Sequence, residues 1–241
     1  MVDLSSVKAL TFDVGGTVFD WHSTIRDEVR GIAAAKGIAE FDAAGYTNAW
    51  RSRMFERLAE VREGKLPWMN ADQLHRMALD DIALRYPSLA LSPAEADDLT
   101  LTWHRLRVWP DFPPALEQLR SRFTVVVLTV LSFSLVVDSS KHGGLSWDGV
   151  LSCEFLGHYK PDAAAYRAGV RALGLTPEQV MMVAAHPWDL RAAREAGLLT
   201  AYVPRPAERG EGRQGDLAAP DFVDVAGSDF PDLARKLVPG K

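Results

Sequence analysis

Short apolar runs alternate with helical patterns along the second half of the chain, and this alternation constrains the fold more than any other feature. The clearest run, Phe123–Leu128, is typical of a parallel strand buried on both faces. Similar runs predict strands at 7–12, 150–153, 180–183, 200–203 and 222–225. Helices are predicted at 115–122, 132–141, 161–173, 187–196 and 230–237, and 176–179 reads as a further capped helix start. The alternation predicts an α/β fold, a doubly wound parallel sheet with a Rossmann-like core.

Residues 22–107 interrupt this alternation with helical signals and no strong strand signal. Four apolar residues at helical spacing share one face: Trp50, Met54, Leu58 and Val61. The segment Ser92–Glu95 is a capping box with proline at the first helical position, and it predicts a helix that reaches about Leu106. We therefore expect a core domain of residues 1–18 and 110–241, with a helical cap domain at 19–109.

Composition excludes several classes of protein. The chain has 241 residues and a formal charge of -5, and it carries no dense Lys/Arg run, which argues against a nucleic-acid partner. The single cysteine, Cys153, excludes an internal disulfide and a CxxC metal site, and it suits a reducing compartment. No signal segment or apolar stretch of membrane-spanning length is present, so we expect a cytoplasmic protein with no membrane partner.

Asp13 directly follows the first predicted strand, and Gly15 and Gly16 then break it. In an open parallel sheet, ligands bind beyond the carboxyl ends of the strands, so a carboxylate there faces a crevice. Asp13 is therefore a candidate nucleophile or metal ligand, and an aspartate that caps a turn is an equally plain explanation.

Polar residues also follow three other predicted strands, namely Thr129, Lys160, and the segment from His186 to Asp189. Each has a simple structural explanation: Lys160 as a solvated lysine before a helix, Asp189 as a first-turn residue favoured by the helix dipole. Their joint occurrence in this order points to one site at the strand ends.

In this order the residues resemble the four motifs of the haloacid dehalogenase superfamily of hydrolases. The correspondences are Asp13-Val-Gly-Gly16-Thr17 for the Asp-x-x-Gly-Thr motif, Thr129 for the second motif, Lys160 in Tyr-Lys-Pro-Asp for the third, and Ala184-Ala-His-Pro-Trp-Asp189 for the acidic fourth. The helical insert after the first motif is similar to the cap domain of that superfamily.

The resemblance separates two chemistries. Phosphatases of the superfamily need an acid/base aspartate two residues after the nucleophile and a second aspartate, in the fourth motif, to hold magnesium. Gly15 and Ala185 stand at these positions. Without those carboxylates a leaving alkoxide gains no proton and magnesium loses an oxygen ligand. We therefore expect no metal and no cofactor.

The 2-haloacid dehalogenase branch is the better match, because a halide leaves without a proton. The segments that resemble it are Phe19–Ser23, Trp50-Arg51, Tyr159–Asp162 and Trp188-Asp189. The implied mechanism is displacement of the halide from a small 2-haloalkanoic acid by Asp13 through an ester intermediate. Lys160 would keep Asp13 ionised.

The resemblance also implies roles for the remaining candidates. Thr17 and Thr129, with backbone amides, would hold the substrate carboxylate, and Arg51 would stabilise the departing halide. Asp189, together with His186, would position the water that cleaves the ester. Trp188 and aromatic residues of the cap would keep the site dry.

Two positions depart from the pattern of this branch. Where its members carry Ser-Asn after the second strand, the chain has Thr129-Val130, and valine cannot donate a hydrogen bond. His186 stands where an asparagine is common, and resembles a subgroup reading Ala-Ala-His-x-x-Asp, some of which act on fluoroacetate. Arg53 competes with Arg51 as the cap arginine. The Gly/Arg-rich stretch Glu208–Gly215 is expected to be a flexible surface loop.

Other functions remain open at this level. One alternative is a hydrolase of the same fold that acts on another small carboxylate, such as a strained ring acid, or on a phosphate ester. Val130 also admits a catalytically weak binding protein. The expected partner is a small-molecule carboxylate, with a homodimer as one option by analogy with relatives.

Overall fold

The computed structural model describes residues 4–210 and 218–239. Six strands form one sheet in the order β5-β4-β1-β6-β7-β8, and every neighbouring pair is parallel. The strands are β1 (Ala9–Phe12), β4 (Thr124–Thr129), β5 (Gly149–Ser152), β6 (Val180–Ala184), β7 (Leu199–Tyr202) and β8 (Val225–Ala226). The predicted doubly wound parallel sheet is confirmed.

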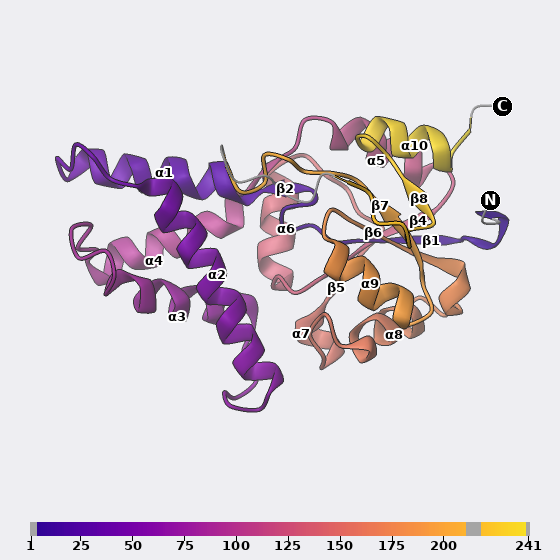
Figure 1. The fold of residues 1–241 in the computed structure, drawn as a ribbon, viewed down its shortest axis with the longest axis horizontal. Coiled ribbons are helices and arrows are strands. Elements are labelled where there is room, and N and C mark those ends of the chain that lie inside the picture. Colours follow the sequence, from indigo (N-terminus) through magenta and orange to yellow (C-terminus); the bar gives the residue numbers. More distant parts are fainter. Residues whose placement is uncertain (1–3, 211–217, 240–241) are drawn as a thin grey trace.

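Helices cover both faces of this sheet (Figure 1). They are α5 (Phe112–Arg120), α6 (Phe133–His142), α7 (Cys153–Leu156), α8 (Ala163–Ala172), α9 (Pro187–Glu195) and α10 (Phe230–Leu237). In the view of Figure 1, α5 and α10 lie on one side of the sheet, and α8 and α9 on the other. The central strands β1 and β6 are buried along their whole length, which explains why their sequences are apolar except for Thr11.

The long segment between β1 and β4 forms a second, helical layer beside the sheet (Figure 1). It contains α1 (Trp21–Ala35), α2 (Ala43–Arg62), α3 (Ala71–Ala83) and α4 (Pro93–Leu101). A two-stranded antiparallel ribbon, β2 (Phe19–Asp20) with β3 (Arg107–Val108), joins the point where the chain enters this layer to the point where it leaves. The proposed division into a cap at 19–109 and a core follows this ribbon.

Several expected elements differ in length from those observed. The helix that opens at Ser92 ends at Leu101, and a 3-10 turn (Thr102–Arg105) continues the chain. Thr176 caps only a 3-10 turn, Pro177–Gln179, because the chain enters β6 at the next residue. A further 3-10 turn, Leu4–Ser6, precedes β1.

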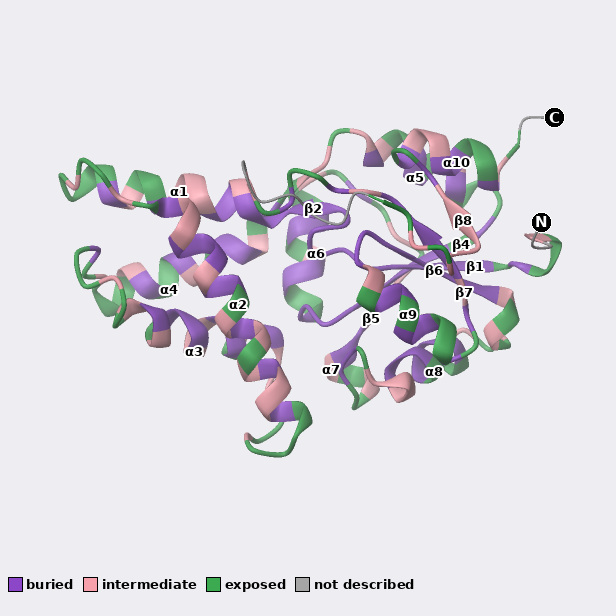
Figure 2. Ribbon diagram, viewed as in Figure 1, coloured by how far each residue is buried: buried purple, intermediate pink, exposed green. Residues whose placement is uncertain are grey.

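One hydrophobic cluster runs from the sheet into the helical layer (Figure 2). On the sheet side, the Phe12 ring lies 5.5 Å from that of Phe112 and 6.0 Å from that of Phe230. On the helical side, Trp50 and Trp103 meet edge to face at 5.5 Å.

Among the described residues, no helix is both long and apolar enough to cross a membrane.

Candidate active site

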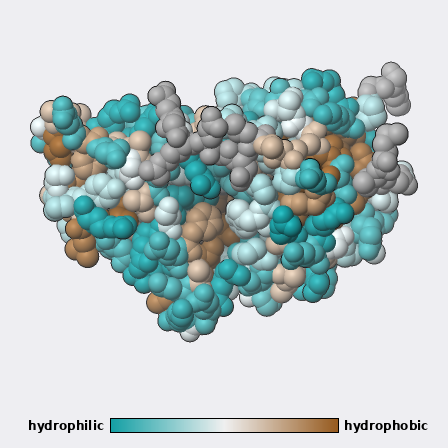
Figure 3. Space-filling model, in the orientation of Figure 1, coloured by the Kyte–Doolittle hydropathy of each residue, from teal (hydrophilic) through white to brown (hydrophobic). Residues whose placement is uncertain are grey.

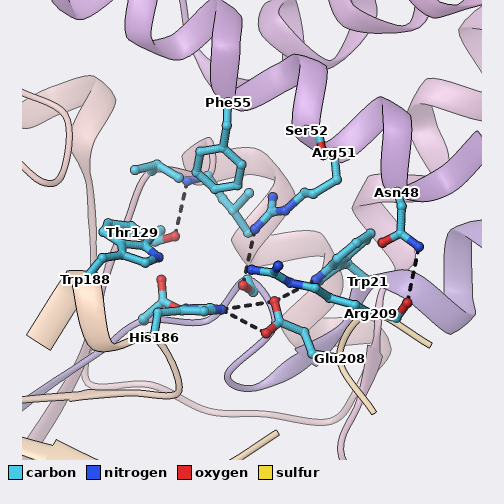
Figure 4. A pocket seen from close by; sticks show the side chains of 14 residues that line it. Trp21, Asn48, Arg51, Ser52, Phe55, Thr129, His186, Trp188, Glu208 and Arg209 are labelled. Carbon is cyan, nitrogen blue, oxygen red and sulfur yellow. Dashed lines mark hydrogen bonds and ion pairs between the residues drawn. The ribbon is translucent and has the colours of Figure 1, made fainter. Parts of the chain in front are cut away.

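The cavity lies where the carboxyl ends of three adjacent strands meet the helical layer. β1 pairs with β4 on one side and β6 on the other, so the residues that follow these strands come together. A cavity of about 340 Å³ opens there (Figure 4). Its lining from the sheet side includes Asp13, Gly15, Thr129, Val130, Leu131, His186 and Trp188, and from the helical layer Trp21, Asn48, Arg51, Ser52 and Phe55.

Asp13 lies between two cations at this edge of the sheet. Its Oδ1 is 3.4 Å from the Lys160 ammonium, and its Oδ2 is 3.1 Å from the His186 Nδ1 and accepts a 2.7 Å hydrogen bond from the Thr17 hydroxyl. Burial alone would raise the pKa of Asp13, but the Lys160 charge, with His186 and Thr17, outweighs it and holds that pKa below its ordinary value. Asp13 is therefore an ionised carboxylate in a buried site.

Lys160 is held behind Asp13 by a second carboxylate. The Lys160 ammonium donates to Asp189 Oδ2 at 2.7 Å, and the Tyr166 hydroxyl donates to the other oxygen of Asp189 at 2.5 Å. Burial opposes the charge of Lys160, but Asp189 and Asp13 raise its pKa above the ordinary value. Asp189 is fully buried, does not line the cavity and lies behind Lys160; its role in positioning water stays a prediction.

Thr17 also forms a hydrogen bond with Asp13. Its hydroxyl donates to Asp13 and accepts a 3.0 Å hydrogen bond from the Ala185 amide, and the residue is fully buried outside the cavity lining. The expected contact between Thr17 and a substrate carboxylate stays a prediction. Thr129 does line the cavity, and its Oγ1 accepts a bond from the Leu131 amide, which leaves its hydroxyl proton for a ligand.

His186 joins Asp13 to a carboxylate that sequence reasoning missed. Its Nε2 lies 3.0 Å from both oxygens of Glu208, and Glu208 also accepts a 3.0 Å hydrogen bond from the Trp21 indole (Figure 4). Burial would lower the pKa of His186, but Glu208 and Asp13 raise it to about 10. His186 is therefore an imidazolium that donates to two carboxylates.

Glu208 was missed because it lies in a Gly/Arg-rich stretch without secondary structure. The expectation of a surface loop over 208–215 is wrong for Glu208, which is 6% exposed; residues 211–215 lie outside the described part of the chain. Gly16 has a φ of +103°, and a Cβ there would lie 2.1 Å from Glu208 Oε1. The second glycine of the first motif therefore makes room for Glu208, and no feature of the local sequence shows this.

Arg51 reaches the cavity from α2 through a ring of aromatic side chains. Its guanidinium carbon lies 4.6 Å from the ring centre of Phe55, 5.3 Å from Trp21 and 5.6 Å from Trp103. Its Nη2 donates to the Gly15 carbonyl at 3.2 Å, and its Nη1 is buried with no hydrogen-bond partner among the described residues. The site therefore offers a desolvated donor for an anion.

Of the two candidate arginines of α2, Arg51 lines the cavity and Arg53 does not. Arg53 forms ion pairs with Asp81 at 2.7 Å and Glu56 at 2.6 Å, away from the cavity. A Cβ on Gly15 would approach the Nη2 of Arg51 to 3.0 Å, so the glycine that stands in place of the phosphatase acid also makes room for Arg51.

Trp188 lies at the rim of the cavity rather than sealing it. Its ring stacks on His186 at 5.9 Å and meets the Phe55 ring edge to face at 6.4 Å, while 40% of the residue stays exposed. A second, more apolar cavity of about 350 Å³ begins on the other side of this aromatic pair and shares Phe55, Trp188 and Arg209 with the first. In the space-filling view an apolar patch lies in a hollow between the two parts of the molecule (Figure 3).

The magnesium site of the superfamily's phosphatases does not fit these residues. Magnesium is bound through oxygen ligands and needs carboxylates beside the nucleophile. Here the oxygens of Asp13 face the ammonium of Lys160 and the imidazolium of His186, and Ala185 and Gly15 offer no side-chain oxygen. We derive no step through a metal.

The fold, with a buried, ionised aspartate at the end of β1, is that of a hydrolase family. The model of the haloacid dehalogenase-like hydrolase family matches residues 7–197. The chain belongs to this family, which confirms the predicted membership and hydrolase class.

Named relatives and solved structures are similar over most of the chain. (S)-2-haloacid dehalogenase 4A of Burkholderia cepacia is 29% identical over 208 residues, which cover 85% of each chain. Haloacetate dehalogenase H-2 of Moraxella sp. (strain B) is 25% identical, covering 84% of this chain and 88% of the relative. The crystal structure of an L-2-haloacid dehalogenase is 38% identical with a TM-score of 0.89, covering 96% of this chain and 99% of that one. A defluorinating L-2-haloacid dehalogenase is 35% identical with a TM-score of 0.90, covering 96% of this chain and 95% of that one.

Proposed function

We propose that the protein is a metal-independent 2-haloacid dehalogenase that acts on small 2-haloalkanoic acids. The observation that carries the proposal is an ionised Asp13 held between Lys160 and His186, with Gly15 where a phosphatase has its acid. An oxygen-protonating acid is needed to expel an alkoxide but not a halide, so this site suits a carbon–halogen bond better than a phosphate ester. The relatives and solved structures named above support the same substrate class.

In the first step, an oxygen of Asp13 attacks the carbon that bears the halogen. A carbon–oxygen bond forms, the carbon–halogen bond breaks, and the electron pair leaves with the halide. The buried Nη1 of Arg51, between the rings of Trp21 and Phe55, receives that anion in a site from which water is largely excluded. Attack from the rear inverts the carbon.

In the second step, water attacks the carbonyl carbon of the Asp13 ester. Ester formation removes the negative charge of Asp13, one of the two that raise the pKa of His186. His186 then releases its Nδ1 proton to solvent and accepts one from the attacking water, while Glu208 stabilises the imidazolium. As the bond between the Asp13 carbonyl carbon and the substrate oxygen breaks, His186 passes that proton to the departing oxygen, and it regains a proton from the carboxylic acid formed at Asp13. The products are a 2-hydroxy acid, halide and one proton. Because hydrolysis breaks the bond at the Asp13 carbonyl, the inverted configuration at the substrate carbon is kept.

We also propose a reducing, cytoplasmic setting for this activity. Cys153 is free and fully buried, and burial raises the pKa of its thiol to about 12. A thiol with so little thiolate reacts slowly with oxidants.

The nucleophile can be tested by halide release and isotope transfer. We expect wild-type protein to release chloride from (S)-2-chloropropionate and Asp13→Asn to release none, because the second carboxylate of the cavity lining, Glu208, is already held by His186 and Trp21. Asp98→Asn, an exposed residue with the same change of charge, serves as the control and should keep full activity.

A single turnover with excess enzyme in heavy-oxygen water should place the label on the Asp13 carboxylate, detected by peptide mass spectrometry. Label that appears only in the hydroxy acid would show direct attack by water and contradict the ester route.

A further inference from the structure

The end of β4 offers the carboxylate of a haloacid fewer donors than the resemblance led us to expect. Thr129 and Val130 both line the cavity, and Val130 contributes only an apolar side chain. On the opposite wall, the amide of Asn48 already donates to the carbonyls of Ala44 and Arg209. The Thr129 hydroxyl is then the side-chain donor that the end of β4 offers to a carboxylate, and a charged donor from another segment would strengthen its binding.

Arg209 lies on the cavity wall at a well-anchored part of the chain. Asn48 of α2 donates to its carbonyl at 3.2 Å, and the preceding residue, Glu208, is held by Trp21 and His186. Its side chain points into the cavity beside Trp21 and Glu208 (Figure 4). The Arg209 guanidinium forms no ion pair with any other described residue, so the side chain is available to a ligand.

The charges around the cavity favour a ligand with one negative charge. Lys160 is balanced by Asp189, and His186 lies between Asp13 and Glu208. These groups leave Arg51 and Arg209 as the two cations of the site without a carboxylate at ion-pair distance among the described residues. A haloacid presents two negative centres in the reaction, its carboxylate and the halide that departs.

The two arginines are suited to different parts of that substrate. The guanidinium of Arg51 is buried among aromatic rings, where a weakly hydrated halide fits. Arg209 is exposed and lines both the active-site cavity and the second, more apolar cavity. A hydrated anion that enters from solvent can therefore reach it. A guanidinium also matches the planar, two-oxygen geometry of a carboxylate.

We propose that Arg209 binds the substrate carboxylate and thereby sets the preference of this enzyme for acids over neutral halocarbons. The proposal rests on the proposed dehalogenase function and adds a specificity residue to it. Arg209 provides the donor that Val130 cannot.

The test compares Arg209→Met and Arg209→Lys with wild-type protein. We expect Arg209→Met to raise the KM for (S)-2-chloropropionate by about 10- to 100-fold with kcat changed much less, because a charge-assisted bond to the bound acid is lost in ground state and transition state alike. Arg209→Lys should recover part of the loss. The KM for the neutral analogue 2-chloropropionamide should not change, so that the ratio of kcat/KM for the acid to kcat/KM for the amide falls.

Arg85→Met is the matched control, since Arg85 is exposed, lies away from the active-site cavity and carries the same charge. It should leave KM unchanged. An unchanged KM in Arg209→Met, or an equal loss for the acid and the amide, would overturn the proposal.

Binding of propionate, measured by calorimetry, separates this proposal from the proposed function. If wild-type protein releases no halide, the dehalogenase function fails, and weaker binding of propionate to Arg209→Met than to wild type still supports the carboxylate site. Equal binding to both proteins, or binding to neither, overturns it.

Discussion

At the scale of single residues, the site depends on charges that hold one another in place. Asp13 stays ionised because Lys160 and His186 face it, and His186 stays protonated because Asp13 and Glu208 face it. Breaking one member of such a buried network leaves its partners uncompensated, which is costly. The network therefore links the stability of the fold to pH.

The pH dependence of stability tests the His186 part of this network. The pKa of His186 is raised from 6.5 to about 10, so its ion pairs contribute stability that is fully present below about pH 6.5 and is lost as pH rises through about 10. We expect the free energy of unfolding of wild-type protein to fall between pH 7 and 10 by up to about 1.4 kcal/mol per pH unit relative to His186→Gln. Urea unfolding at a series of pH values measures this difference.

His158→Gln is the control for that experiment, because His158 is exposed. It should follow the wild-type curve. A His186→Gln curve parallel to wild type across this range would show that His186 does not carry the proton.

At the scale of elements, the helices of the insert begin at residues whose side chains cap them. Asn70 and Gln73 exchange side-chain to backbone bonds at the start of α3, 3.1 Å and 3.0 Å long. The same helix presents Asp72 to Ser132 at the start of α6, at 2.9 Å. The start of α3 therefore also joins the helical layer to the core.

Removing the Asn70 side chain that caps α3 should weaken this junction measurably. We expect Asn70→Ala to lower the free energy of unfolding by about 1 kcal/mol, because the amide of Gln73 loses its acceptor. Asn70→Asp keeps an acceptor at the same place and should stay close to wild type. Chemical denaturation of the three proteins measures the effect, and equal losses in both variants would show that the capping bond is not the cause.

At the scale of the whole molecule, the hydrophobic cluster crosses from the sheet into the helical layer without a break. Phe112 is fully buried on the sheet side, and Trp50 and Trp103 are buried on the helical side. Two parts that share one core are expected to unfold together.

Truncating a side chain on the sheet side of this cluster should therefore also destabilise the helical layer. We expect Phe112→Ala to cost about 3–5 kcal/mol and to shift the unfolding of both layers by the same amount. Fluorine NMR of protein labelled with 5-fluorotryptophan follows Trp50 and Trp147 separately. Leu84→Ala, at a residue 85% exposed, should shift neither. Separate midpoints for the two tryptophans would contradict a shared core.

The parallel sheet, its helices and the presence of a helical insert were predictable because each depends on local pattern. Strands buried on both faces must be continuously apolar, and helices must repeat their apolar residues with their own period. Asp13, Thr129, Lys160 and His186 were found for the same reason, since each follows a strand whose end the pattern shows.

The partners of those residues were decided by the tertiary structure alone. Tyr166 and Glu208 reach the site from segments whose local sequence has no signal for it. The hydrogen bonds of Asp189 with Lys160 and of Thr17 with Asp13 are likewise seen only in the structure. The sequence by itself determined which strand ends carry chemistry, because secondary structure is a local property. Which side chain meets which, and with what charge, depends on distances across the fold, and only the packing of the chain brings Glu208 and Arg209 to the cavity that Asp13 shares.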